Sequence, residues 1–402
     1  MCDTPLHPSH AHVRLGWLDV MKGLSILWIV FFHFFTTYDD NHMGWPLDRG
    51  FFANFIDHCH PASLSEWIGC TAEACWVGAV KLGFHAVSVF LVLSGFGLTY
   101  SLTKPGAVEK GWKTWYLRRV LRLFPMYWIA HLIYLISPFV ARPEPIDYRF
   151  LLSFFGDRVY PLDTIMFYMN PAWWYFGLLL QLYIAFPFLF RLLQKAGPGW
   201  FLAITALITF GSRYVMLVVH PVHGNYVQGA FFTARLWEFA SGMFLGVYFR
   251  SRPGIMMERL FSGPALAAGI ALYALGLLSY PGLYGSGLTY SFTDGLIGTG
   301  LFIILAHAAR WCAMVPTVSK GLAYVGVYSY SLYLLHQPYV IYFGERMRCM
   351  ELGAFTIAAG AIIAVIFLLC APIEKFANKW TGKLLDHGLR TPSTTLSTPS
   401  GS

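Results

Sequence analysis

Charged residues are scarce in this chain of 402 residues: they make up 12% of it, whereas 56% of the residues are hydrophobic and 18% are aromatic. Soluble domains normally carry about 25% charged residues, and a soluble globule of this length could not bury so much apolar surface. The composition therefore excludes a soluble globular protein and predicts a polytopic membrane protein.

Several signatures of nucleotide-dependent enzymes and hydrolases are missing too. The sequence contains no glycine-rich loop of the P-loop or dinucleotide-binding type, so no ATP or nicotinamide site is predicted. Ser94-Gly95-Phe96 lacks the flanking pattern of a hydrolase nucleophile elbow. Neither an internal repeat nor a matched pair of broken apolar segments is visible, which disfavours a transporter without excluding one.

Long apolar runs are abundant instead. A hydrocarbon core of about 30 Å requires about 20 apolar residues per helix. Segments of this length predict an all-α fold, a polytopic bundle of about ten transmembrane helices. The ten segments lie near 16–36, 78–102, 123–141, 171–190, 199–219, 229–249, 262–282, 290–309, 323–343 and 352–372.

The net charge of +8 is distributed unevenly between the loops. Segment 104–122 holds six cations against one acid, and the positive-inside rule places it in the cytoplasm. Segment 37–77 has six acids against one arginine and is expected to face outward. Ten spans with both termini cytoplasmic satisfy every loop, so the positive charge indicates topology rather than nucleic-acid binding.

The chain is predicted to form one membrane domain. Residues 1–15 form a cytoplasmic N-terminal segment, 16–375 the transmembrane domain, and 376–402 a cytoplasmic, low-complexity tail that ends in TPSTTLSTPSGS. The apolar run that begins at Leu15 lacks a small-residue cleavage site, so we expect the first helix to remain in the protein.

Three of the seven cysteines, Cys59, Cys70 and Cys75, lie in the predicted outer loop. An oxidising compartment would permit one disulfide there, and the spacing leaves its pairing open. The neighbouring His58 and His60 have no further ligands at defined spacing, so we assign no metal site.

Ionisable side chains inside spans are costly in hydrocarbon and normally face a bundle interior or a wet cavity. Lys22 and His33 lie eleven positions apart in the first predicted helix, which separates them by about 16 Å, with His33 near the outer end. The same count places five more groups in the outer leaflet: His85, Arg235, Glu238, Asp294 and His336. Three cations lie instead at the inner mouth of the third predicted helix: Arg118, Arg119 and Arg122.

Each of these groups also has a structural interpretation. Arg235 and Glu238 share a helical face, where they either neutralise each other or contact a substrate. The buried histidines could serve as hydrogen-bonding contacts between helices. The basic cluster could simply fix topology and contact anionic membrane lipids, and Trp173 and Trp174 could belong to an interfacial aromatic belt.

Six motifs, in order along nearly the whole chain, resemble the acyltransferase-3 group of integral membrane acyltransferases. The first is Leu18-Asp19-Val20-Met21-Lys22-Gly23 followed by His33. The others are Phe90 to Phe96 (FLVLSGF), Tyr116 to Trp128 (YLRRVLRLFPMYW), Trp174-Tyr175-Phe176 through Pro187, Arg235 to Phe239 (RLWEF) through Gly242, and Tyr328 to Pro338 (YSYSLYLLHQP).

The resemblance implies transfer of an acyl group, usually acetyl, from cytoplasmic acyl-coenzyme A to a hydroxyl of a carbohydrate or lipid-linked glycan. It implies a multi-pass protein of a bacterial inner membrane that acts at the outer face. His33 would be the general base, which suits an imidazole that titrates near neutral pH. Direct transfer and a route through an acyl-histidine on His33 or His336 both remain open.

The resemblance also suggests roles for the remaining polar residues. The cations Arg118, Arg119 and Arg122, with Lys22, would hold the phosphates of coenzyme A. Asp19, Glu238 and Asp294 would orient a histidine or bind sugar hydroxyls, and His85, Arg235 and Trp174 would line the acceptor site. The candidate oxyanion donors are Tyr330, Ser331, Trp174 and Tyr127.

Two features depart from the family pattern. Lys22 stands where arginine is common, which keeps the charge and loses the bidentate fork. The chain also lacks the appended hydrolase-like domain of some members, so it resembles the stand-alone ones. A rival hypothesis is a secondary transporter or flippase with an intramembrane proton relay, which would not depend on acyl-coenzyme A.

Overall fold

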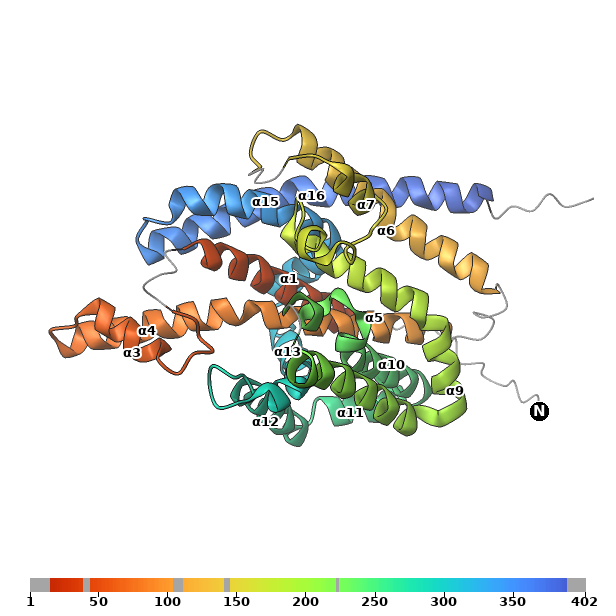
Figure 1. Cartoon of the computed structure of the whole chain (residues 1–402), viewed down its shortest axis with the longest axis horizontal. Coiled ribbons are helices and arrows are strands. Elements are labelled where there is room, and N and C mark those ends of the chain that lie inside the picture. Colours follow the sequence, from red (N-terminus) through yellow and green to blue (C-terminus); the bar gives the residue numbers. More distant parts are fainter. Residues whose placement is uncertain (1–14, 39–43, 104–110, 141–144, 222–223, 389–402) are drawn as a thin grey trace, which may run out of the picture.

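The computed structural model describes residues 15–38, 44–103, 111–140, 145–221 and 224–388, and within these ranges the regular structure is entirely helical. This confirms the all-α class. Figure 1 shows α1 (Gly16–Thr37) in the middle of the bundle, where it packs against α14 (Pro316–Val327), α15 (Ser329–Met347) and α13 (Gly287–Cys312). The first and last predicted segments, 1–15 and 376–402, lie largely outside the described residues.

The other long helices overlap the predicted apolar segments with different bounds. They are α4 (Leu64–Lys81), α5 (Ala86–Leu102), α6 (Gly111–Ile136), α9 (Trp174–Tyr214), α10 (Leu236–Ser251), α12 (Gly263–Leu278) and α16 (Leu352–Gly388). Shorter elements connect them: α3 (Phe51–Cys59), η1 (Leu82–His85), α7 (Tyr148–Phe154), α8 (Leu162–Ile165), η2 (Pro171–Trp173), η3 (Val215–Val219), η4 (Tyr226–Ala230), η5 (Phe232–Arg235) and α11 (Pro253–Leu260).

Six of the described helical stretches are long and apolar enough to cross a membrane, and a seventh candidate is the pair α11 and α12, which bends by 62°. The multi-pass membrane character is thus confirmed. The number ten and the cytoplasmic termini stay predictions, because several helices, such as the 16-residue α10, are shorter than a full span.

The second predicted segment, 78–102, lies within a longer helix. The helix starts at Leu64 and continues through η1 to Leu102, a stretch of 39 residues rather than 25. It is about 58 Å long, nearly twice the thickness of a hydrocarbon core. A capping box between Ser63 and Glu66 starts this helix far from the bundle, and the α3–α4 hairpin projects at one end in Figure 1.

A disulfide between Cys59 and Cys70 joins α3 to α4 within this hairpin. Cys75 remains a free, exposed thiol. The pairing that the spacing left open is therefore Cys59 with Cys70.

Two predicted segments, 171–190 and 199–219, merge in α9. The helix breaks at Gly197, whose φ of +78° lies in the left-handed region, and Pro198 follows it. Glycine adopts this conformation without a Cβ clash, and proline has no N–H to donate to the preceding turn. The two halves of α9 therefore run in different directions.

Close helix contacts in the bundle depend on glycine. A Cβ at Gly242 of α10 would overlap the carbonyl oxygen of Val92 in α5, and a Cβ at Gly95 would overlap the carbonyl oxygen of Phe239. Small residues allow helix backbones to approach within van der Waals contact, which drives association where no hydrophobic effect operates. The α5–α10 pair thus forms a rigid wall of the bundle.

We expect Gly242→Ala to lower the thermal midpoint of the detergent-solubilised protein, because the added methyl overpacks the α5–α10 contact at a cost of about 1–3 kcal/mol. The matched control is Gly321→Ala on α14, where a Cβ would have no neighbour within 4 Å. Equal midpoints for the two variants in a thermal-shift assay would contradict this account of the packing.

Candidate functional site

A cavity of about 890 Å³ runs between α1, α5, α6, α9, α13 and α15. It lies within the range of pockets that hold small-molecule ligands. Ten of the residues that the sequence predicts as site residues line it: Lys22, His33, His85, Arg119, Arg122, Trp174, Arg235, Asp294, Tyr330 and His336. Five do not line it: Asp19, Arg118, Tyr127, Glu238 and Ser331.

Cations gather at one end of the cavity. Lys22 pairs with Asp19 at 3.2 Å, so Asp19 contributes by holding that lysine. Arg119 packs its guanidinium over the ring of Trp115, 5.5 Å from the ring centroid. The Nε of Arg119 is buried without a hydrogen-bond partner among the described residues. An unpaired buried donor beside Arg122 and Lys22 fits an anionic group in the cavity.

Two imidazoles meet about 16 Å further along the helix axis of α1. His33 Nδ1 lies 3.0 Å from Nε2 of His336, which comes from α15. Nδ1 of His336 lies 2.9 Å from the carbonyl oxygens of both Leu332 and Tyr333. His336 is fully buried, and its side chain is therefore held at both ring nitrogens.

A proline explains how α15 holds His336 in place. Pro338 has no N–H, so the carbonyl oxygen of Leu334, four residues earlier, loses its helical partner. Asn170 Nδ2 and Trp173 Nε1, beside the start of α9, both donate to this oxygen at 2.8 Å. Through Pro338, the motif His336-Gln337-Pro338 thus attaches α15 to η2, which directly precedes α9.

Charges at the outer end form a closed network. The Arg235 guanidinium donates to Glu238 at 2.6 Å and to Ser88 at 2.9 Å, and its Nε lies 3.7 Å from Asp294. Arg213 donates to the same oxygen of Asp294. The predicted ion pair between Arg235 and Glu238 is present, and Glu238 is buried behind Arg235 rather than facing the cavity.

Aromatic groups complete the outer end. Both ring nitrogens of His85 meet tyrosine hydroxyls, with Tyr273 at 3.0 Å and Tyr280 at 3.1 Å. Trp174 lines the cavity and packs against Gly229, whose φ of +147° and missing side chain leave room for the indole. Trp173 instead stacks on His131 in the core, with ring centroids 4.0 Å apart.

Three of the candidate oxyanion donors use their hydroxyl protons inside the protein. Tyr330 donates to the carbonyl of Leu123, Ser331 to that of Tyr328 and Tyr127 to that of Ser153. Only Trp174 of the predicted set keeps an N–H beside the cavity. A further candidate was missed: Tyr175 lines the cavity, and its buried hydroxyl lies near Ser94 without a close hydrogen bond among the described residues.

Other residues were missed although the sequence carried a signal for them. Arg213 is a fully buried cation within predicted span 199–219, and the rule that selected His33 applies to it equally. Glu374 and Asn378 line the cavity just after the last predicted span, and the Glu374 carboxylate accepts the backbone N–H of Ser331 at 2.9 Å. Glu374 and Asn378 were missed because they lie beyond residue 372, where the last predicted span ends.

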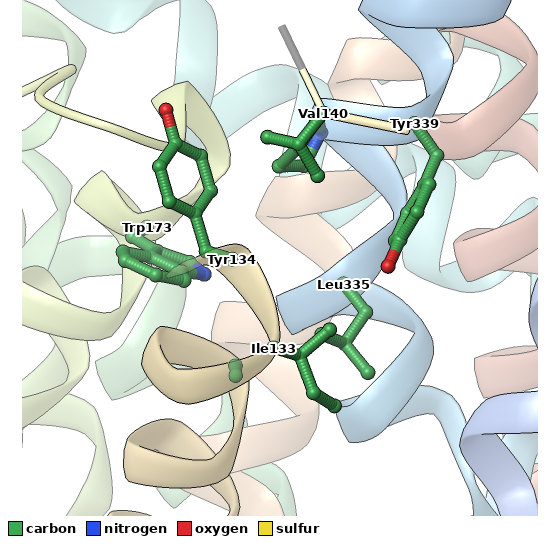
Figure 2. Close-up of a pocket in the computed structure, with 8 residues that line it drawn as sticks. Ile133, Tyr134, Val140, Trp173, Leu335 and Tyr339 are labelled. Carbon is green, nitrogen blue, oxygen red and sulfur yellow. The ribbon is translucent and has the colours of Figure 1, made fainter. Parts of the chain in front are cut away.

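A second pocket lies between α6, α15 and Trp173 (Figure 2). Apolar and aromatic side chains surround it, including Ile133, Tyr134, Val140, Leu335 and Tyr339. Its volume of about 10 Å³ corresponds to about one water molecule. It is too small for a substrate. In the part of the chain that the structure describes, no three His, Cys, Asp or Glu side chains cluster as metal ligands would.

Comparisons with known proteins cover most of the chain. Residues 15–373 match a family model described as an acyltransferase domain. The chain is 25% identical over 311 residues to BcsY of Komagataeibacter xylinus, named a membrane-bound transacylase, covering 73% of this chain and 75% of that protein. It is 25% identical over 344 residues to the acyltransferase MdmB of Streptomyces mycarofaciens, covering 78% and 84%. No solved structure gives a significant match.

Proposed function

The chain belongs to the acyltransferase-3 family of membrane acyltransferases, and from that premise we propose that it transfers an acetyl group from cytoplasmic acetyl-coenzyme A to a hydroxyl at the outer face. The acceptor is a cell-envelope carbohydrate or glycolipid, and the membrane is the bacterial cytoplasmic membrane. Membership of an enzyme family argues against the transporter hypothesis. The observation that carries the proposal is one cavity with cations at one end and a histidine pair at the other.

The donor would enter from the basic end. Arg119 and Arg122 line the cavity there with Lys22, and the unpaired Nε of Arg119 would donate to a phosphate oxygen of coenzyme A. Arg118, which does not line the cavity, would add positive potential at its mouth. The pantetheine arm would then extend toward His33, a span of about 16 Å along α1.

His33 would act as the general base on the acceptor. As the acceptor oxygen attacks the thioester carbonyl carbon, its proton passes to the imidazole, and the new C–O bond forms. Collapse of the tetrahedral intermediate breaks the C–S bond, and the coenzyme A thiolate takes the proton back from the imidazolium. Direct transfer of this kind requires no nucleophile from the protein.

The outer end would bind the acceptor. Trp174 offers an aromatic face for a sugar ring, and Asp294, whose other oxygen is held by Arg213, offers a hydroxyl acceptor. Glu238 would act indirectly, by fixing the guanidinium of Arg235. His85, held by two tyrosines, would shape the wall, and the hydroxyl of Tyr175 would donate to the oxyanion.

We expect His33→Ala to reduce acceptor-dependent release of coenzyme A by at least about 100-fold, because general base catalysis contributes about 10²–10⁴ in rate. The measurement is free thiol produced by purified protein from acetyl-coenzyme A, with and without a cell-envelope glycan extract. Wild-type turnover by the variant would rule out this base.

Removing the cations at the inner end is expected to weaken donor binding. Arg119→Ala and Arg122→Ala should each raise KM for acetyl-coenzyme A about tenfold, since one charge-assisted hydrogen bond is worth about 1.5–3 kcal/mol, and kcat should change less. The control is Arg252→Ala, an exposed arginine outside the cavity. An unchanged KM in both variants would show that the donor does not bind at Arg119 and Arg122.

We expect Tyr175→Phe to lower the rate of catalysis without lowering the stability of the fold. The hydroxyl makes no close hydrogen bond among the described residues, so its removal should leave the thermal midpoint unchanged or raised. If it donates to the oxyanion, kcat should fall by about 10²–10³ while KM for the donor is retained. A control is Tyr248→Phe on α10, outside the cavity; a kcat equal to that of the control would exclude Tyr175 as the donor.

A further inference from the structure

We infer that His336 is a positioning residue: it fixes His33 in the tautomer whose Nε2 is free to take the acceptor proton. The inference rests on the proposed function for its chemistry. Its structural basis is independent, because it follows from the atoms that surround the two rings.

The main chain determines the protonation of His336. Its Nδ1 lies 2.9 Å from two carbonyl oxygens, those of Leu332 and Tyr333. Carbonyl oxygens only accept hydrogen bonds, so Nδ1 must carry the proton. In a neutral imidazole the other nitrogen is then bare, and Nε2 of His336 is a hydrogen-bond acceptor.

The protonation of His33 follows from that of His336. His33 Nδ1 lies 3.0 Å from the bare Nε2 of His336, so it must donate its own proton there. The remaining nitrogen of His33, Nε2, has no hydrogen-bond partner among the described residues, so its lone pair is free, and His33 lines the cavity.

The carboxylates that line the cavity are committed to other partners. Asp294 accepts from Arg213 and lies 3.7 Å from Arg235, and Glu374 accepts from the N–H of Ser331. A second imidazole therefore takes the place that a carboxylate has in serine hydrolases, where it holds the catalytic histidine in one tautomer. When His33 Nε2 gains the acceptor proton, the Nδ1–H···Nε2 bond to His336 stabilises the imidazolium.

The same hydrogen bonds argue against His336 as a nucleophile. Its Nε2 lone pair points at His33, and its Nδ1 faces the main chain. An acyl-histidine on His336 would require both contacts to break. The alternative route through an acyl-enzyme is thereby confined to His33.

The test compares two substitutions of similar size. His336→Gln retains an acceptor oxygen near the position of Nε2, whereas His336→Leu retains volume without an acceptor. We expect His336→Leu to lower kcat at least 100-fold with KM for acetyl-coenzyme A within threefold of wild type, and His336→Gln to stay within about tenfold of wild-type kcat. The matched control is His307→Gln, a buried histidine outside the cavity that contacts the carbonyl of Leu260.

Equal losses in the two variants, or wild-type kcat in His336→Leu, would overturn the inference. So would radiolabelled acetyl recovered on wild-type protein but not on His336→Gln. A fully active His33→Ala would instead indicate that the proposed base, and with it the proposed function, is wrong.

A spectroscopic measurement on the wild-type protein does not depend on activity or on the folding of the Leu variant. In protein labelled with ¹⁵N-histidine, the two resonance sets lost in His33→Gln and in His336→Gln identify the pair. We expect both rings to show a protonated Nδ1 and a bare Nε2. A protonated Nε2 on either ring would overturn the inference.

Discussion

Hydrogen-bond satisfaction without water is the main constraint on the interior of this protein. A polar group within a membrane span must either bond to another group of the chain or face a cavity. Pro338 leaves the carbonyl oxygen of Leu334 without a helical partner, and this oxygen accepts hydrogen bonds from Asn170 and Trp173. The Asp294 carboxylate accepts a hydrogen bond from Arg213. Among the described residues a minority of buried side-chain polar atoms stay unpaired, and two of these, the Nε of Arg119 and the hydroxyl of Tyr175, belong to residues that line the cavity.

A single helix relates the two ends of that cavity. Lys22 and His33 both lie on α1, so the helical rise fixes the distance between them, independently of how loops move. The contact between Gly23 and α14, where a Cβ would overlap the carbonyl of Leu322, holds α1 in register beside the chain that leads into α15. A donor bound by its phosphates would thus carry its thioester to a constant depth.

Sequence reasoning found much of this arrangement and missed identifiable parts of it. The spacing of Lys22 and His33, the basic third helix and the charges in the outer leaflet were readable because hydrocarbon makes such residues costly. The pairing of His33 with His336 was not, since helical periodicity carries no information on which helices become neighbours. Tyr175 escaped notice for a similar reason: only packing shows that its hydroxyl lacks a partner. Most of α4 was assigned to the outer loop 37–77, because its outer turns are too polar to resemble a span.

The two histidines of the pair are separated by 303 positions in the chain. His33 lies on α1 and His336 on α15, so the pair forms only when these two helices pack together. Until then the first imidazole has no partner to fix its proton. A chain in which α15 has not yet packed against α1 therefore lacks the contact between the two imidazoles.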